Sequence, residues 1–134
     1  MGESGKISGE CVGSIASHSF GNNAMIINCY NKADIYGVRS GGIADNFTGG
    51  KIICCINFGN VQCIEGGIQG GITSYTADTV WGSYSNTELT NEIFNGQLID
   101  SEIKMEFSLS YLNEKLEQAK NEFELENIPI KCWE

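Results

Sequence analysis

The sequence predicts a mainly β fold: a short right-handed parallel β-helix, or β-solenoid, of about three coils with a C-terminal α-helical cap. An apolar segment over residues 24–35 aligns without gaps on residues 50–61, and residues 79–85 follow the same pattern, at offsets of 26 and 28 residues. A Gly-[Gly/Ser]-Ile step precedes each copy, at residues 13–15, 41–43 and 66–68. Such a period in a glycine-punctuated apolar segment is typical of stacked supersecondary units.

Each repeat unit has room for three short strands and the corners between them. In the middle unit the strands are expected at residues 41–45, 51–57 and 60–64, with turns at 46–50 and 58–59. Glycine and asparagine tolerate the left-handed backbone that tight corners need, and both recur at these turns. The three units are predicted over about residues 11–37, 38–64 and 65–86.

The best copy of the repeat carries a resemblance to a known family. Residues 26–35 read Ile-x-Asn-Cys-Tyr-Asn-x-x-x-Ile, and Gly-Gly-Ile-Ala follows at 41–44. This pattern resembles the GLUG-type repeat of large bacterial surface proteins, including adhesin-like chains and the non-catalytic stalk of immunoglobulin-A-cleaving metalloproteases. The match covers roughly residues 11–86. The resemblance implies a β-solenoid module at the cell surface or outside the cell, with no catalytic residue and no cofactor to carry over.

Composition divides the chain into two parts. Residues 1–86 contain 16 of the 17 glycines and are predicted to form the solenoid, whereas residues 87–134 contain 11 of the 17 acidic side chains and are predicted to form a helical capping segment. The net charge of −9 offers no basic surface for nucleic acid. No apolar run reaches the length of a membrane span, and residues 1–9 lack the apolar core of a signal peptide.

Equivalent residues of successive units are expected to form ladders along the stack. Cys29 and Cys55 occupy one such position, which favours free, packed thiols, with disulfides and a metal site as the alternatives. Asn31 and Asn57 occupy another, where their amides could bond to each other or act as ordinary turn residues. The remaining ladder residues are predicted to be Ile26, Ile52, Val80, Ile35 and Val61. Both parities of the central strand are apolar, so the pattern does not decide which face is buried.

The tail carries the spacing of an amphipathic helix. Leu109, Leu112, Leu116, Ala119 and Phe123 recur every three or four residues. Of these, the apolar cap over the last coil is predicted to consist of Leu109, Leu112, Leu116 and Phe123, because an open stack needs a cover at its end. A shorter helix is expected over about residues 88–95. The first coil has no evident cover, which allows end-to-end self-association through the N-terminal coil.

No pattern of catalytic or metal-binding residues is recognised. His18 is the single histidine and lies in a serine-rich loop, where a solvated side chain is expected, with a pair between Cys11 and His18 as the alternative. We therefore expect no enzyme, no metal and no cofactor, but a structural or adhesive repeat module. The alternatives are a self-stacking unit of a filament, or a carbohydrate-binding module. A surface glycan or a host protein would be the partner, bound through exposed aromatic residues chosen from Tyr30, Tyr36, Phe47, Phe58, Tyr75, Trp81 and Tyr84.

Overall fold

The computed structural model describes residues 5–21, 24–75, 77–86, 97–98 and 109–130. The mainly β prediction is confirmed: strands alternate with short corners up to residue 86, and one helix follows in the tail. The elements are β1 (Lys6–Gly13), β2 (Ala16–Phe20), β3 (Met25–Ile27), β4 (Tyr30–Asn31), β5 (Asp34–Gly41), β6 (Ala44–Ile53), β7 (Ile56–Asn57), β8 (Val61–Gly70), β9 (Ala77–Trp81), β10 (Tyr84–Ser85), β11 (Gln97–Leu98) and α2 (Leu109–Glu122).

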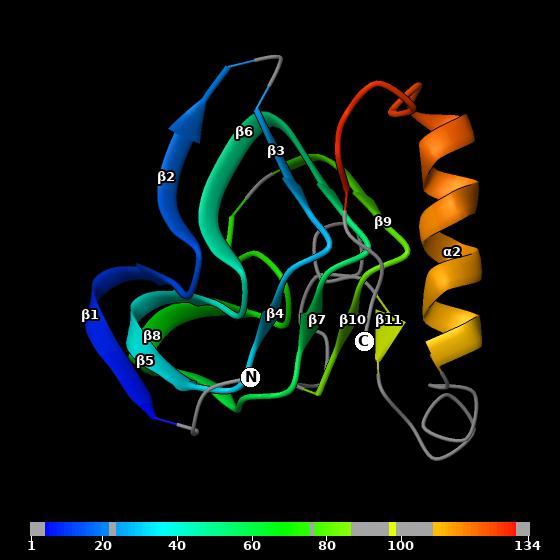
Figure 1. The fold of residues 1–134 in the computed structure, drawn as a ribbon. Coiled ribbons are helices and arrows are strands. Elements are labelled where there is room, and N and C mark those ends of the chain that lie inside the picture. The colour runs from blue at the N-terminus through cyan, green and yellow to red at the C-terminus, as the bar shows by residue number, and fades with distance from the viewer. Residues whose placement is uncertain (1–4, 22–23, 76, 87–96, 99–108, 131–134) are drawn as a thin grey trace.

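The strands form three parallel sheets. One has the order β1-β5-β8, and a second has the order β11-β10-β7-β4. In the third sheet β6 pairs with β2 and β3 along its length and also with β9. The chain visits the sheets in the same sequence in each repeat, so that strands from successive repeats lie beside one another, as β1 in blue, β5 in cyan and β8 in green do (Figure 1).

The prediction of a right-handed parallel β-helix, or β-solenoid, of about three coils was wrong, because the strands belong to three separate parallel sheets. The backbone at the corners explains the separation. Asn28, Cys54 and Gly82 stand at equivalent positions and have φ angles of 59°, 54° and 56°. A left-handed residue turns the extended backbone at this corner, and the next strand runs in a different sheet.

The strand register follows the sequence repeat closely. Ile26 pairs with Ile52, which pairs with Val80, and Ile35 pairs with Val61. The third glycine step is an exception, since Gly66, Gly67 and Ile68 lie inside β8 and do not begin a unit. Its place is taken by residues 70–72, and the isolated bridge from Ala44 to Thr73 follows directly.

The misplaced step has a local cause in β8. Gly37 pairs with Cys63 but Arg39 pairs with Ile68, so β8 holds three residues more than β5 between these pairs. Gly66 has a φ of 79°, a value that glycine adopts at little cost. A bulge of this kind lengthens the repeat locally, so that Gly41 pairs with Gly70 and the glycine step of the third repeat falls at residues 70–72.

Apolar side chains cover both faces of the sheet formed by β3, β6 and β9. The Ile26 and Ile52 row points into the core between the sheets, with Ile43, Phe47 and Ile72. The adjacent row, Ile27, Ile53 and Trp81, packs against the tail. Two-sided burial is common in parallel sheets, and it answers the question that the apolar parity of the central strand left open.

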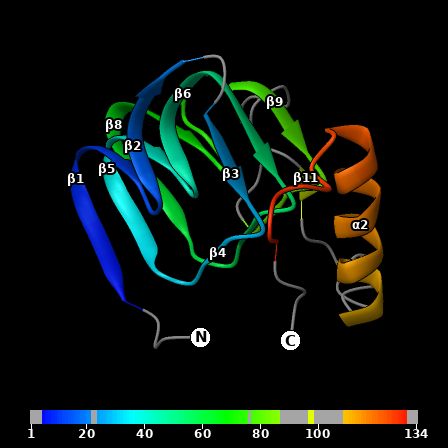
Figure 2. The ribbon, with the colours of Figure 1, turned by 45° about the horizontal axis from the view of Figure 1, so that its top comes forward.

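Helix α2 packs along the side of the sheets and not across the last strand. Leu116 and Ala119 are fully buried against Ile53 and Cys54, and the ring of Phe123 meets that of Trp81 edge-on at 5.7 Å. Leu112 packs near Ile56 and Tyr84, whereas Leu109 is 51% exposed. The tail helix was predicted, but its predicted position over the last coil was wrong. The apolar row that α2 covers runs across β3, β6 and β9. Figure 2 shows α2 beside the sheets.

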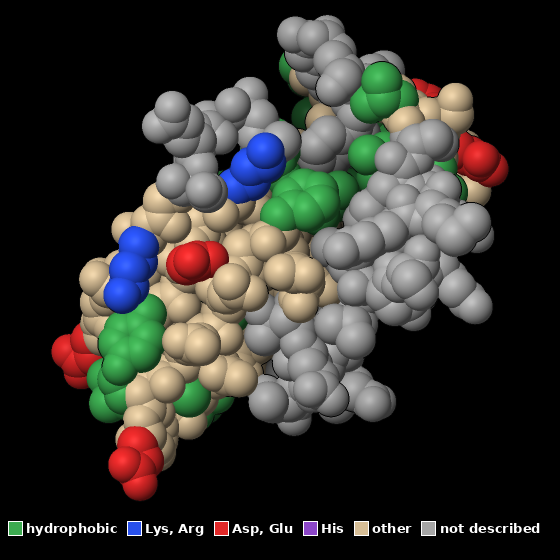
Figure 3. Space-filling model, turned by 90° about the horizontal axis from the view of Figure 1, so that it is seen from below, with side chains coloured by type: hydrophobic (Ala, Val, Ile, Leu, Met, Phe, Trp, Pro, Cys, Tyr) green, Lys and Arg blue, Asp and Glu red, His purple; other side chains and the backbone are tan. Residues whose placement is uncertain are grey.

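Helix α2 is neither long nor apolar enough to cross a membrane, and it is the only helix in the described part of the chain. The shorter helix predicted over residues 88–95 lies outside the described residues. Seen from below, the described surface carries separate basic, acidic and hydrophobic side chains without a large patch of any one kind (Figure 3).

Candidate functional site

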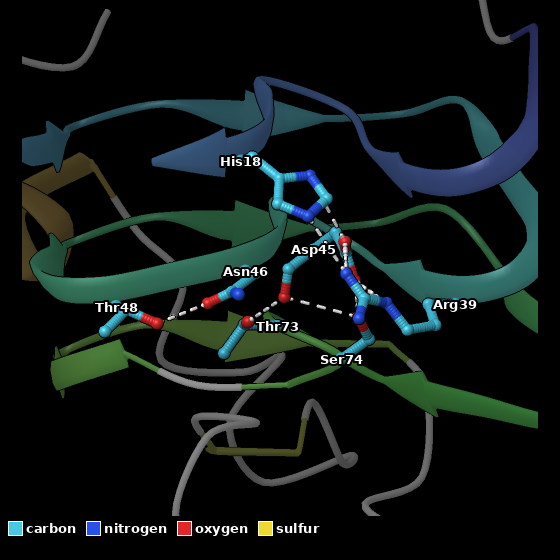
Figure 4. A network of polar contacts seen from close by, with 7 residues as sticks. All are labelled: His18, Arg39, Asp45, Asn46, Thr48, Thr73 and Ser74. Carbon is cyan, nitrogen blue, oxygen red and sulfur yellow. Dashed lines mark hydrogen bonds and ion pairs between the residues drawn. The ribbon is translucent and has the colours of Figure 1, made fainter. Parts of the chain in front are cut away.

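The densest group of polar side chains lies where the sheet of β1, β5 and β8 meets the sheet of β2, β6 and β3. Arg39 comes from the end of β5, Asp45 from the start of β6 and His18 from β2, while Ser74 precedes β9. The register brings them together, because Ala16 pairs with Ala44 and Ala44 with Thr73, which aligns the residues that follow each alanine or threonine. Figure 4 shows the side chains converging on the Asp45 carboxylate.

The Asp45 carboxylate is completely buried and its oxygens are occupied. Arg39 donates from Nε to Oδ1 at 3.1 Å and from Nη2 to Oδ2 at 2.5 Å. Ser74 Oγ also donates to Oδ1, and Thr73 Oγ1 donates to the Asp45 backbone oxygen at 2.7 Å. The hydrogen bond to Asp45 raises the pKa of Arg39 above its ordinary value. A buried carboxylate with a bidentate arginine and a hydroxyl donor is a satisfied structural ion pair.

His18 lies beside this ion pair with 41% of its side chain exposed. Its Nε2 lies 3.1 Å from Arg39 Nη2, and its Nδ1 lies 3.7 Å from Asp45 Oδ2. Arg39 can only donate, so Nε2 accepts and the proton of the neutral ring is on Nδ1. Serine hydrolases need the histidine between serine and aspartate. Here Ser74 bonds to Asp45 directly, so the three residues do not form a catalytic triad.

The sequence pattern did not predict this cluster, because it placed His18 in a solvated loop and the third glycine step at residues 66–68. Aligning residues 70–72 with residues 41–43 puts Ser74 opposite Asp45, which is the signal that would have found it. Cys11 lies close enough to Arg39 to contribute to raising its pKa.

The asparagine ladder is a second group of paired polar side chains. Asn31 Nδ2 donates to Asn57 Oδ1 at 2.8 Å, and Asn57 Nδ2 lies 3.3 Å from Ser85 Oγ. Each asparagine also binds the turn that follows it, since Oδ1 of Asn31 accepts from the Ala33 N–H and Oδ1 of Asn57 from the Gly59 N–H. The structure therefore combines the two roles that the sequence left open, a ladder contact and a turn contact.

The cysteine positions are occupied by thiols. Cys11, Cys29, Cys54, Cys55 and Cys63 are free, and Cys132 lies outside the described residues. A side-chain hydrogen bond with Cys55 lowers the pKa of Cys29 to about 7, against the opposing effect of burial. Burial raises the pKa of Cys54 to about 11 and that of Cys55 well above its ordinary value. Among the described residues, no three His, Cys, Asp or Glu side chains gather as metal ligands would.

Two surface hollows lie near these groups. An apolar groove of about 430 Å³ is lined by Ile15, residues 25–29 and residues 128–130, with Cys29 on its wall. A smaller hollow of about 220 Å³ is lined by Lys6, Asp34, Ile35, Tyr36, Asn60 and Gln62.

The aromatic residues considered for glycan binding divide by exposure. Tyr36, Phe58 and Tyr75 are between 39% and 52% exposed. Phe47 and Tyr84 are buried, and Tyr30 and Trp81 are partly buried. Of the exposed rings, Tyr36 lines the smaller hollow.

Comparisons with known proteins give no relative. No family model matches the chain, and neither the curated proteins nor the solved structures include a significant match. The resemblance to GLUG-type repeats therefore rests on the sequence pattern alone.

Proposed function

We propose that the chain is a non-enzymatic structural module of a bacterial cell-surface or secreted protein. One observation carries this proposal: the buried Asp45 carboxylate is bonded to neighbouring side chains, with Arg39 and Ser74 as its donors. A catalytic carboxylate needs a free oxygen or a perturbed protonation state directed at a substrate. The Asp45 oxygens instead hold together β5, β6 and the segment before β9, which favours a structural role.

The proposed location rests on the sequence resemblance to GLUG-type repeats. The repeated asparagine contacts are in keeping with a module built from stackable units, because each amide fixes its own turn and the neighbouring unit at once. We further propose that the N-terminal strands take part in self-association.

Carbohydrate binding is the second candidate function, and the hollow beside Tyr36 favours it. A tyrosine ring that is 39% exposed can stack on a sugar, and Asp34, Asn60 and Gln62 surround it with hydrogen-bonding groups. Pockets for small polar ligands combine an apolar platform with a few convergent polar groups in this way.

Glycan-array binding together with hydrogen exchange tests the two functions. If the chain has a structural role, the amides of β5, β6 and β7 exchange slowly, and the parent chain gives glycan signals no higher than those of Tyr36→Ala. Tyr75→Ala is the matched control, since Tyr75 is an exposed tyrosine far from the small hollow in sequence and absent from its lining. A saturable glycan signal that Tyr36→Ala abolishes and Tyr75→Ala retains would replace the structural role with carbohydrate binding.

A further inference from the structure

Strand β1 presents an open edge. It is the outermost strand of its sheet, and β5 is the only described strand that pairs with it. Every residue from Lys6 to Glu10 is exposed. An exposed strand edge is a template on which another strand can pair.

The backbone direction of β1 can be derived from one hydrogen bond. The Asp34 N–H donates to the Gly5 carbonyl oxygen at 2.8 Å. Because successive residues of a strand direct their backbone groups to opposite sides, the odd-numbered residues of β1 face β5. The N–H and C=O groups of Lys6, Ser8 and Glu10 therefore point to the open edge.

The side chains of the same three residues share one face of the sheet, because side-chain direction alternates along a strand. Lys6 Nζ lies 5.4 Å from the centroid of the Tyr36 ring, which is exposed, so this face is the solvent face. Ile7 lies on the opposite face beside Ile35, yet Ile7 is 36% exposed while Ile35 is 1% exposed. The apolar face of β1 is thus incompletely covered in the single chain.

A second copy of this chain fits the edge in one register. In an antiparallel pair, the residues whose backbone groups point outward must lie opposite one another to exchange hydrogen bonds. Centring a two-fold axis on Ser8 places Ser8 opposite its own counterpart and Lys6 opposite Glu10. The two-fold repeats this opposite-charge contact, so a pair of copies contains it twice.

Other features of the same end favour a second copy as the occupant. The strands β1, β2, β3 and β4 form the outer edges of the three sheets on this side (Figures 1 and 2). Ile15 is 48% exposed and Met25 is 40% exposed there, and both line the apolar groove. The whole chain has a net charge of −9, but β1 contains one lysine and one glutamate, so this strand itself adds no net charge repulsion between copies.

We propose that two copies associate through antiparallel pairing of β1 with β1, with Lys6 of each copy opposite Glu10 of the other. This inference rests on the self-association included in the proposed function and specifies its surface and register. The contact is isologous, so it closes at the dimer and removes the open edge from solution. It also covers apolar side chains at the N-terminal end.

Charge-swap variants measured by sedimentation equilibrium test the register. Lys6→Glu or Glu10→Lys places like charges opposite each other at both symmetric contacts, and each raises the dimer dissociation constant at least about tenfold. The double variant Lys6→Glu/Glu10→Lys restores it to within about threefold of the parent, because the pairs are opposite in charge again. Glu65→Lys, at an exposed position of β8, is the matched control and leaves the dissociation constant unchanged.

A backbone variant tests the pairing itself. Ser8→Pro removes the N–H that faces the partner and leaves the hydrogen bonds from the odd-numbered residues to β5, so the folded chain becomes monomeric with its circular dichroism retained. A parent chain that is monomeric throughout, or a dimer that the swaps and Ser8→Pro do not weaken, would overturn the β1 contact. Neither result bears on the structural role, which the glycan and hydrogen-exchange measurements test separately.

Discussion

Replacing Asn57 with alanine tests the idea that the asparagine ladder stabilises the fold. Asn57 is completely buried. Its Oδ1 accepts from Asn31 Nδ2 at 2.8 Å and from the Gly59 N–H at 3.2 Å, and its Nδ2 donates to the Gly59 and Gly71 carbonyl oxygens at 3.1 Å each. The alanine variant loses these four hydrogen bonds and the 3.3 Å contact of Nδ2 with Ser85 Oγ.

The size of the effect follows from the partners that are left behind. Asn31 Nδ2 keeps its bond to the Ala33 carbonyl oxygen, so it is not stranded. Gly59 and Gly71 are buried and lose side-chain partners. An unsatisfied buried polar group costs about 1–3 kcal/mol, so we expect Asn57→Ala to lower the free energy of unfolding by about 3–5 kcal/mol. That is a large part of the roughly 5–15 kcal/mol of a typical domain.

Urea denaturation followed by circular dichroism measures this change through the shift of the midpoint at constant slope. Asn60→Ala is the control, because Asn60 is an exposed asparagine three residues away and its backbone bonds to Ile35 and Asp34 do not involve its side chain. The control should change the stability by less than about 0.5 kcal/mol. If Asn57→Ala is as stable as Asn60→Ala, the ladder does not stabilise the fold.

Three further predictions concern the thiols, the buried ion pair and the helix. With its pKa lowered to about 7, Cys29 should be alkylated at half its maximal rate near pH 7 and faster as the pH rises. Cys54, with its pKa raised to about 11, should stay unmodified up to pH 9. Mass spectrometry of native samples measures the alkylation of both thiols, and a Cys29 midpoint near pH 9 would contradict the prediction. Arg39→Met leaves the buried Asp45 carboxylate without its cation, so chemical denaturation should show a free energy of unfolding lower by about 3 kcal/mol. An unchanged denaturation midpoint would show that the ion pair contributes no stability. Leu116→Asp should expose the apolar row under α2 and cause aggregation that light scattering detects. Leu109→Asp, at a side chain that is 51% exposed, should leave the protein as soluble as the parent. If the two variants behave alike, the packing of α2 does not protect the sheets from aggregation.

The sequence repeat was sufficient to determine which residues pair across neighbouring strands. The offset of 26 residues between the two best copies places Ile35 beside Val61 and Asn31 beside Asn57, because parallel pairing in register brings like residues together. The spacing of apolar residues in the tail was likewise sufficient to predict a helix, since the 3.6-residue period leaves few alternatives.

The tertiary structure decided three features of the fold that the sequence repeat does not determine. The left-handed corners separate the strands into distinct sheets, which the predicted β-helix did not allow for. The bulge in β8 shifts the third glycine step, and only this shift brings Ser74 to Asp45.

The third was the burial of both apolar rows of the central sheet. A pattern along the chain records which side of a strand a residue is on, but not what lies against that side. Helix α2 is distant in sequence from the Ile53 row, and its placement there depends on contacts between segments that no local pattern encodes. The sequence therefore determined the pairing of neighbouring repeats, and long-range packing decided the sheets, the polar cluster and the position of the helix.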